Sequence, residues 1–473
     1  MDNNRRIINV LRALFGKVIV KLLIPIILVS FASCKNEEID EIPDFDNDSL
    51  KSINEEIIPN LKIKEGIVSQ KSDTFRIVRD GHAIAIVRLS EPVLVAMAEK
   101  EESWGFFQFP RIFRAEDNKI VVYWQMKADS HTAYGEEGYD YRVSNDGGII
   151  WGALDREYFR RDRDRVELSN GDILQVQTPE ACSINKFDTF PSPVNPNPIS
   201  NFNFYFETEL PEELKGVYFF KWDKQNKQTT LFHARIKDPD YLRYDIDGLF
   251  PIVWWGNIKE KKDGSLIAGV YPTHYLNSEG IALRSSVAFY QSIDGGKNWD
   301  IVGKIPYQVD GKSADSFVFD GEDGFTEPAF DILKNGKYIC VMRSGSSTPM
   351  YKAFSTDEGK TWSLPTTFTP NGVMPQLLQL DNGIIALSSG RPGVQLRFCV
   401  DGNGDTWTEP IEMVPFMNED DKYDLWINSC GYSCLLKESD NSFYIVYSDF
   451  NRLTQDAQRR KAIVFRKVDV IKR

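Results

Sequence analysis

The sequence predicts an all-β fold of the propeller type, in which small antiparallel sheets repeat along the chain. Three observations point to it. Short apolar-rich runs alternate with turn sequences such as Asp263-Gly264 and Asn335-Gly336, a pattern typical of β-hairpins. An eight-residue signature recurs along the chain, and internal repeats indicate a repeated structural unit. Beyond the N-terminal segment, no stretch has the periodicity of an amphipathic helix.

Seven apolar-rich runs are the clearest predicted strands. They cover residues 75–78, 83–87, 119–124, 216–222, 339–342, 384–388 and 443–447. The segment 177–203 is rich in Pro and Asn, so we expect it to form a long loop over one face.

The recurring signature is S-x-D-x-G-x-x-W, and its three intact copies end at Trp151, Trp299 and Trp362. We expect the Ser and Asp of each copy to bond to backbone amides within a turn. The Gly would supply a positive φ, and the Trp would fold back as an apolar plug. A degraded fourth copy ends at Trp407, where Val400 and Gly402 replace the Ser and the Asp.

The chain length bounds the number of repeats. The first two copies of the signature begin 148 residues apart, which leaves room for two blades that lack a copy. About 400 residues at roughly 40–60 residues per four-stranded blade give six or seven blades. We therefore expect a single propeller over residues 75–473, without a second domain.

Residues 1–33 are predicted to be an export signal. A basic region precedes a mostly apolar run over residues 18–29, and Ala32 and Ser33 precede Cys34. The apolar run is too short and wrongly flanked for a membrane-spanning helix. Small residues before a Cys resemble the lipobox of bacterial lipoproteins, although Phe31 replaces the usual Leu. That resemblance implies a lipidated Cys34, held at a membrane surface by its acyl chains. An ordinary signal peptide and an uncleaved anchor are the alternatives.

Residues 34–74 are predicted to be a tether. The stretch 35–49 is acidic, and Ile39 and Ile42 are its only bulky aliphatic residues, so it cannot bury a core. Acidic residues behind a lipidated Cys resemble the surface-export signal of Bacteroidetes lipoproteins, with a plain solvated linker as the alternative. The expected location is therefore an outer membrane or cell surface.

The charge of the chain argues against two classes of partner. The formal net charge is −13, and it falls to −17 when residues 1–33 are removed. A protein this acidic is a poor candidate for binding nucleic acid or anionic lipid, although a local arginine cluster can still bind an anionic sugar. Five Cys remain besides Cys34, and their spacing selects no disulfide. No motif indicates a metal, a phosphate loop or a nucleotide cofactor.

The repeated signature behind an export signal resembles the Asp boxes, or BNR repeats, of the sialidase (neuraminidase) superfamily, whose propeller has six blades. The resemblance implies that the Asp residues of the boxes are structural and lie on the outer rim. The boxes alone therefore say nothing about catalysis.

Other segments resemble the active site of that family. Phe109-Pro110-Arg111-Ile112 is a permuted form of the Phe-Arg-Ile-Pro motif that opens the first blade, whose Arg binds the substrate carboxylate. Glu327-Pro328 followed by Met342-Arg343-Ser344 resembles the Glu-Pro and Arg-Ser-Gly segments. Gly431-Tyr432-Ser433 resembles the segment with the Tyr nucleophile. For the third Arg, Arg391 is the first choice and Arg397 the second.

The resemblance implies a role for each of these residues. Tyr432 would attack the sugar and Glu327 would take its proton, because Tyr is a poor nucleophile at its usual pKa of about 10. Three Arg side chains would bind the substrate carboxylate through charge-assisted bidentate bonds. Such sialidases are exceptions to the rule of two catalytic carboxylates. Asp449 would pair with Arg111 and orient it.

The acid/base residue is expected in the loop after the strand at 121–126, and Asp129 is the first candidate. The loop departs from the family's usual sequence, so four alternatives stay open: His131, Glu136, Glu137 and Asp140. Four tryptophans could stack on sugar faces or pack in the core or rim: Trp104, Trp254, Trp255 and Trp426.

Three functions follow from these observations. The first is an exported, retaining exo-glycosidase that removes a terminal acidic sugar, most simply sialic acid. The second is a relative that acts on another acidic glycan, such as a uronic-acid-terminated one. The third is a surface propeller that binds glycans without catalysis.

Overall fold

The computed structural model describes residues 60–62, 73–115, 117–153, 165–194, 201–309, 312–313, 324–345, 348–414 and 432–473. Residues 1–55 form one unit and residues 56–473 another. The predicted export signal, Cys34 and the acidic stretch lie outside the described residues, so they stay predictions. In the part of the chain that is described, no helix is long and apolar enough to span a membrane.

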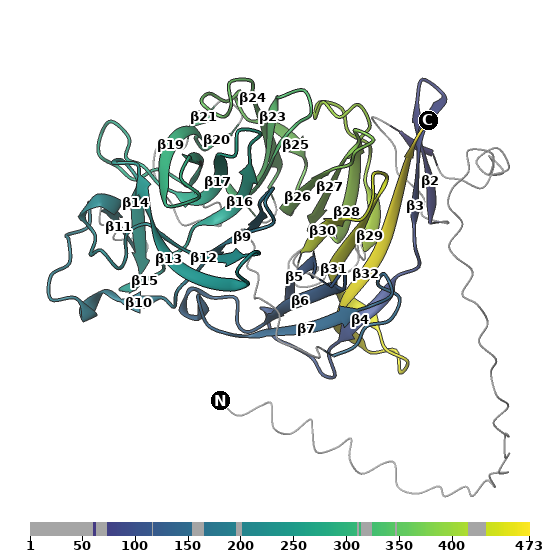
Figure 1. The fold of residues 1–473 in the computed structure, drawn as a ribbon, viewed down its shortest axis with the longest axis horizontal. Helices are drawn as coiled ribbons and strands as arrows, with labels where there is room; N and C mark the ends of the chain where they lie inside the picture. Colours follow the sequence, from purple (N-terminus) through teal and green to yellow (C-terminus); the bar gives the residue numbers. More distant parts are fainter. Residues whose placement is uncertain are drawn as a thin grey trace, which may run out of the picture. The chain divides into compact units, whose positions relative to one another are not determined.

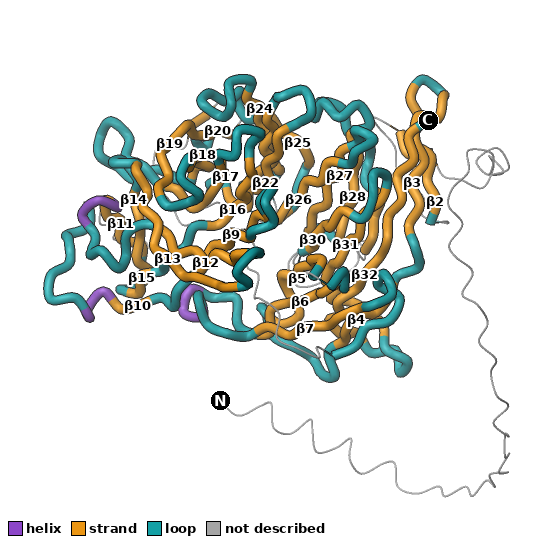
Figure 2. The backbone as a smooth tube through the Cα atoms, in the orientation of Figure 1, coloured by secondary structure: helices purple, strands orange, loops and turns teal. Residues whose placement is uncertain are grey.

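The described part of the chain is all-β, as predicted (Figure 2). Its helical segments are three single 3-10 turns: η2 (His131–Ala133), η3 (Ile184–Lys186) and η4 (Glu207–Glu209). Each of the seven predicted strands coincides with a strand of the structure, although three of them, at 119–124, 216–222 and 384–388, begin one residue too early. Most of their apolar residues are buried, because alternate side chains point into the spaces between sheets.

Two regular four-stranded antiparallel sheets follow one another along the chain (Figure 1). The first contains β22 (Thr326–Ile332), β23 (Tyr338–Arg343), β24 (Met350–Ser355) and β25 (Thr366–Thr369). The second contains β26 (Val373–Gln379), β27 (Ile385–Gly390), β28 (Val394–Cys399) and β29 (Ile411–Val414).

An eight-stranded sheet precedes them, in the order β16-β17-β18-β19-β13-β12-β9-β8. One half contains β16 (Trp255–Glu260), β17 (Leu266–Thr273), β18 (Ser286–Ser292) and β19 (Asn298–Ile305). The other half contains β8 (Arg165–Glu167), β9 (Ile173–Gln177), β12 (Val217–Asp223) and β13 (Gln228–Lys237). Each half is antiparallel, and the halves join where β13 and β19 pair in parallel.

The two ends of the domain meet in a seven-stranded sheet. It contains β1 (Asn60–Lys62), β2 (Thr74–Arg79), β3 (His82–Leu89), β4 (Val93–Met97), β30 (Ser433–Lys437), β31 (Ser442–Leu453) and β32 (Arg459–Lys472). A three-stranded sheet contains β5 (Phe106–Arg114), β6 (Ile120–Met126) and β7 (Tyr139–Ser144). β1 pairs in parallel with β2, so the predicted tether 34–74 was too long at its C-terminal end.

Two further sheets are interleaved between these. One has the order β10-β15-β14-β11, and the other pairs β20 with β21. Their strands are β10 (Cys182–Ser183), β11 (Phe202–Phe206), β14 (Leu242–Ile246), β15 (Leu249–Phe250), β20 (Gln308–Val309) and β21 (Lys312–Ser313).

The interleaved sheet corrects the expected long loop and fills part of the gap between the first two copies of the signature. The segment 177–203 is not one long loop, because it contains β10, η3 and the start of β11, and Phe190 packs on Tyr205 and Phe250. Two four-stranded groups without a copy lie between the first two copies of the signature: the half with β8, β9, β12 and β13, and the interleaved sheet β10-β15-β14-β11. The half with β16–β19 contains the second copy.

The first strands of successive sheets contact one another. β5 contacts β30, β30 contacts β26, β26 contacts β22, β22 contacts β16, and β16 contacts β8. The faces of neighbouring sheets enclose the apolar core, for example where Val341 and Leu387 share one cluster. The N-terminal ends of these strands are therefore brought together, and the site residues lie there.

The three intact copies of the signature form the predicted turn. In the second copy, Ser292 Oγ donates to Asp294 Oδ1 (2.8 Å), and the N–H of Gly296 donates to Ser292 Oγ (2.9 Å). Trp299 Nε1 donates to Gly296 O (2.9 Å), and the side chain is completely buried. Equivalent bonds occur in the copies that end at Trp151 and Trp362.

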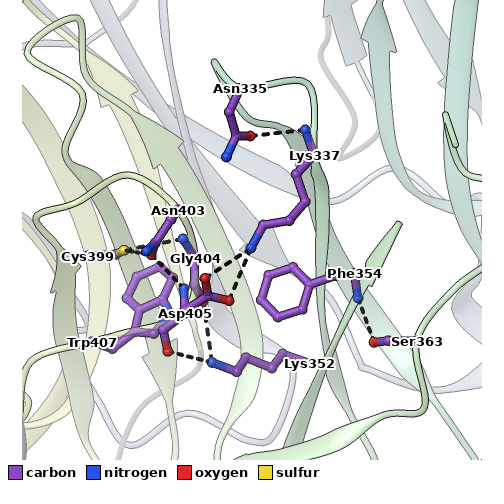
Figure 3. A network of polar contacts seen from close by, with 10 residues as sticks. All are labelled: Asn335, Lys337, Lys352, Phe354, Ser363, Cys399, Asn403, Gly404, Asp405 and Trp407. Carbon is purple, nitrogen blue, oxygen red and sulfur yellow. Dashed lines mark hydrogen bonds and ion pairs between the residues drawn. The ribbon is translucent and has the colours of Figure 1, made fainter. Parts of the chain in front are cut away.

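The fourth copy keeps this turn with different residues (Figure 3). The N–H of Gly404 donates to Cys399 Sγ (3.3 Å), Cys399 Sγ donates to Asn403 Oδ1 (3.5 Å), and Trp407 Nε1 donates to Gly404 O (2.8 Å). Cys399 and Asn403 therefore take the places expected of Val400 and Gly402. The spacing rule failed because one extra residue separates the Cys from the Gly.

The turn that ends at Trp299 should stabilise the fold to a degree that depends on pH. The carboxylate of Asp294 accepts from its neighbours Ser292, Lys297 and Asn298. Burial opposes its charge, but these hydrogen bonds outweigh burial and lower its pKa to about 2. The stabilisation is present above the ordinary pKa and is lost as the pH falls toward 2. Asp294→Asn should lower the free energy of unfolding at pH 7 by about 1–2 kcal/mol.

Urea unfolding at pH 7 and at pH 3 tests this expectation. The loss of stability between the two pH values should be smaller in Asp294→Asn than in the wild type. Asp300→Asn is a matched control, because Asp300 lies in the same hairpin and is exposed. Equal stability of Asp294→Asn and wild type at pH 7 would show that the carboxylate does not stabilise the turn.

Candidate functional site

Four residues with a positive φ lie at or near the start of the strands that contact one another. Phe109, Glu327 and Met374 lie in β5, β22 and β26, and Tyr432 directly precedes β30. Their φ angles lie between 45° and 96°. A non-glycine residue in this region costs about 1–3 kcal/mol and persists only where the surroundings enforce it. Strand pairing is irregular at the first three of these points.

Three of the four residues precede a proline: Phe109-Pro110, Glu327-Pro328 and Met374-Pro375. The resemblance to the family identified the first two dipeptides, but Met374 was missed. The recurrence of X-Pro at the start of inner strands is the sequence signal that could have found it. Phe109, Val373, Met374 and Tyr432 form one buried cluster.

Tyr432 lies between two arginines. Arg343 Nη1 and Arg391 Nη2 each donate to its hydroxyl oxygen at 3.4 Å. Phe109 stacks on the tyrosine ring, with the ring centroids 4.7 Å apart. The side chain of Tyr432 is only 3% exposed, so its hydroxyl is held in a mostly enclosed, positively charged setting.

Each carboxylate oxygen of Glu327 has a bonding partner. Its Oε1 lies 3.1 Å from Arg343 Nη1, and its Oε2 accepts a hydrogen bond from the N–H of Met374 (2.8 Å). Arg343 also donates from Nε to Gly345 O (2.9 Å). Arg343 therefore contacts both Glu327 and Tyr432, and it links the predicted base to the predicted nucleophile.

Burial and charge set the ionisation of the site. Burial raises the pKa of Tyr432 and Glu327 raises it further, while Arg391 and Arg343 act in the opposite direction. The tyrosine is therefore a neutral phenol at rest, and attack needs a base. Burial lowers the pKa of Arg343, because it disfavours the charged guanidinium. The interactions with Glu327 and Tyr432 outweigh this effect, so the pKa of Arg343 is raised.

Asp129 lies in the loop after β6, as predicted. Its Oδ2 accepts a hydrogen bond from Trp104 Nε1 (3.0 Å), and its charge contributes to the raised pKa of Tyr432. Among the alternatives, Asp140 lies on β7 and pairs with Arg142 at 3.1 Å, and His131 begins η2. The backbone carbonyl of Glu136 accepts from Lys127.

An open pocket lies beside Glu327 and Met374, and its space of about 270 Å³ includes open solvent. It is lined by Arg111, Gly256, Asn257, Tyr271, Glu327, Pro328, Met374 and Gln376. Sequence reasoning found Arg111, Glu327 and Pro328 and missed the rest, because polar residues such as Asn257 and Gln376 occur in no motif. Arg111 is 8% exposed, and within the described ranges its buried Nη2 has no hydrogen-bond partner. A buried donor of this kind suits an anionic or polyhydroxylated ligand.

Two predicted site residues lie elsewhere. Arg397 on β28 donates to Thr408 O (3.3 Å) and to Gln395 Oε1 (3.1 Å) rather than to Tyr432. Asp449 on β31 accepts from the N–H of Asn451 (2.9 Å), and among the described residues no ion pair joins it to Arg111. The expected pairing with Arg111 is therefore not found. Burial raises the pKa of Asp449, while the N–H of Asn451 and the charges of Arg452 and Arg459 act in the opposite direction.

The remaining tryptophans differ in their surroundings. Trp254 is 1% exposed and packs against Trp299 in the core. Trp255 meets the ring of Tyr134 edge-on at 5.1 Å, and Trp426 lies outside the described residues. Within the described ranges, no group of three or more His, Cys, Asp or Glu side chains could hold a metal ion.

Comparisons with known proteins show a shared fold. No model of a known protein family matches the sequence, and no curated protein is similar enough to count as a match. The chain is similar to a solved protein of unknown function from Dyadobacter fermentans, with 17% identity and a TM-score of 0.53. The likeness covers 81% of this chain and 99% of that one. At this identity it concerns the fold alone.

Weaker likenesses include two glycosidases. The Hadza microbial sialidase Hz136 has 13% identity and a TM-score of 0.44, over 77% of this chain and 65% of that one. The Penicillium chrysogenum alpha-L-arabinanase has 16% identity and a TM-score of 0.42, over 80% and 98%. TM-scores below 0.5 are too low for either protein to support an argument about this chain.

Proposed function

We propose that this chain is a retaining exo-glycosidase of the sialidase superfamily that removes a terminal acidic sugar, most simply sialic acid. The main support is the placement of the Tyr432 hydroxyl 3.4 Å from both Arg343 and Arg391, with Glu327 3.1 Å from Arg343. A phenol beside a carboxylate and two guanidiniums is suited to attack a carbon that already bears a carboxylate. An anionic Asp or Glu nucleophile would be repelled there.

The first step forms a covalent intermediate. The Tyr432 oxygen bonds to the anomeric carbon while the bond from that carbon to the leaving oxygen breaks. The tyrosine proton passes to Glu327, and Asp129 donates a proton to the leaving oxygen. Arg111, Arg343 and Arg391 bind the carboxylate of the sugar and favour the developing phenolate.

The second step releases the sugar. A water oxygen bonds to the anomeric carbon, and its proton passes to Asp129. The bond to Tyr432 breaks, and the phenol recovers its proton from Glu327. Two displacements at one carbon give net retention, and both carboxyl groups return to their starting state.

We propose that the fold is a six-bladed propeller. The six units are the sheet β5–β7, the two halves of the eight-stranded sheet, the sheets β22–β25 and β26–β29, and the seven-stranded sheet. Its support is the chain of contacts between their first strands. We also propose export and lipid anchoring at Cys34, supported by the N-terminal sequence alone.

A second candidate is hydrolysis of another acidic sugar, such as a uronic acid. One observation favours it. Arg111 lines the pocket, whereas Arg343 is paired with Glu327 and the guanidinium of Arg391 lies over the ring of Trp104. A pocket in which one arginine faces the ligand fits a carboxylate placed differently from that of sialic acid.

A panel of fluorogenic glycosides with one fluorophore separates these functions. We expect release from the sialoside, and none from a galactoside that lacks the carboxylate. Faster release from a glucuronide would favour the second candidate. No release from any acidic glycoside would reject the enzymatic proposals and favour a glycan-binding propeller.

A further inference from the structure

We propose that Trp104 is a positioning residue that holds both Asp129 and Arg391 beside the nucleophile. The effect of Trp104 on catalysis rests on the proposed function, whereas its contacts with Asp129 and Arg391 do not. Trp104 lies in the turn before β5, and no step of the mechanism above uses it.

Trp104 contacts both residues with different parts of its indole. Nε1 donates to Asp129 Oδ2 at 3.0 Å, while the guanidinium carbon of Arg391 lies 4.9 Å from the ring centroid. Arg391 in turn donates to the hydroxyl of Tyr432 and lies 5.2 Å from the centroid of its ring. The two aromatic rings therefore flank one guanidinium, an arrangement favourable for cation–π attraction.

The neighbouring backbone fixes the position of the indole. Gly105 has a φ of 99°, and a Cβ there would lie 2.2 Å from Lys127 O and 2.4 Å from the N of Asp129. Only glycine allows this approach, which brings the turn against the loop of Asp129. Lys461 on β32 donates to Ser103 O (2.7 Å) and Phe106 O (3.3 Å), on both sides of the turn.

These contacts have a specific chemical consequence. A hydrogen bond to Oδ2 orients the carboxyl group and leaves Oδ1 to exchange a proton with the leaving group. The side chain of Asp129 is exposed, so the indole provides an orienting contact that an exposed carboxyl would otherwise lack. Loss of the N–H should then impair protonation of the leaving group more than attack by Tyr432.

Trp104→Phe tests this, because it keeps an aromatic ring beside Arg391 and removes the donor. We expect kcat/KM for a glycoside with a poor, strongly basic leaving group to fall about tenfold or more. For a glycoside with a good leaving group, which needs no acid, the change should stay within about twofold. Trp151→Phe is the matched control, because it removes an indole bond of 2.9 Å in a rim turn. Equal slowing of both substrates by Trp104→Phe, or slowing of neither, would overturn the proposal.

A second measurement does not depend on turnover. In protein labelled with ¹⁵N-tryptophan, the indole signal missing from Trp104→Phe identifies Trp104. We expect Asp129→Ala, which removes the acceptor of the indole N–H, to move this signal further than it moves the other indole signals. A signal that stays in place in Asp129→Ala would contradict the contact. A wild type that hydrolyses no glycoside would reject the proposed function without affecting this result.

Discussion

Tyr432→Phe should abolish turnover and leave substrate binding intact. Without the hydroxyl, no oxygen can attack the anomeric carbon, so kcat should fall at least about 10³-fold, or about 4 kcal/mol in activation free energy. The phenyl ring retains its stacking on Phe109, and the two hydrogen bonds lost are long, at 3.4 Å. We therefore expect the variant to fold and its Kd for substrate to change less than about threefold.

The control for this variant is Tyr241→Phe. Tyr241 is 1% exposed, donates one hydrogen bond to Pro272 O at 3.2 Å and does not line the pocket. The Tyr241→Phe variant loses a buried tyrosine hydroxyl, as Tyr432→Phe does, but it should keep the wild-type kcat. Stopped assays measure kcat, and calorimetric titration measures the Kd for substrate. A Tyr432→Phe enzyme with wild-type kcat would rule out Tyr432 as the nucleophile.

Arg343→Lys should have the second largest effect. Lysine keeps the charge that Glu327 needs inside the protein, but it cannot donate to Glu327, Tyr432 and a substrate carboxylate at once. We expect kcat/KM to fall about 10²-fold, with the fold retained. Arg343→Ala would also remove the ion pair of the buried Glu327 carboxylate, which should destabilise the protein by about 3–5 kcal/mol.

Arg466→Lys is the matched control for the arginine. Arg466 is 6% exposed and donates to Asp73 and to Ser90 O on the seven-stranded sheet. It should lose some stability but no activity. Steady-state kinetics and thermal unfolding of both variants separate the two effects. Activity lost in proportion to stability in both variants would show that Arg343 acts only through the fold.

The sequence predicted the strands and the turns of the repeated signature well, because both depend on local chemistry. A strand run needs only alternating burial, and the turn that ends at Trp299 needs only a Ser, an Asp and a Gly at fixed offsets. The same reasoning failed at Cys399, where a thiol replaces the hydroxyl and the offset changes by one. A pattern with fixed spacing does not detect a turn that keeps its hydrogen bonds but is one residue longer.

The site was predictable where a motif names the residue and not where the fold brings residues together. Glu327, Arg343, Arg391 and Tyr432 were expected and lie together. Met374 was missed because it contributes a backbone N–H, which no residue type reveals. Asp449 was misplaced because a partner across sheets depends on their relative positions, and these are not encoded in any local pattern.

Trapping the covalent intermediate is the most direct test of the central claim. The protein would be incubated with a fluorinated analogue of the sugar that it hydrolyses, because the fluorine slows the second step. The protein would then be digested, and the labelled residue would be identified by mass spectrometry. We predict a sugar adduct on Tyr432, with none in Tyr432→Phe. An adduct on a carboxylate, or turnover with inversion at the anomeric carbon and no adduct, would contradict the account.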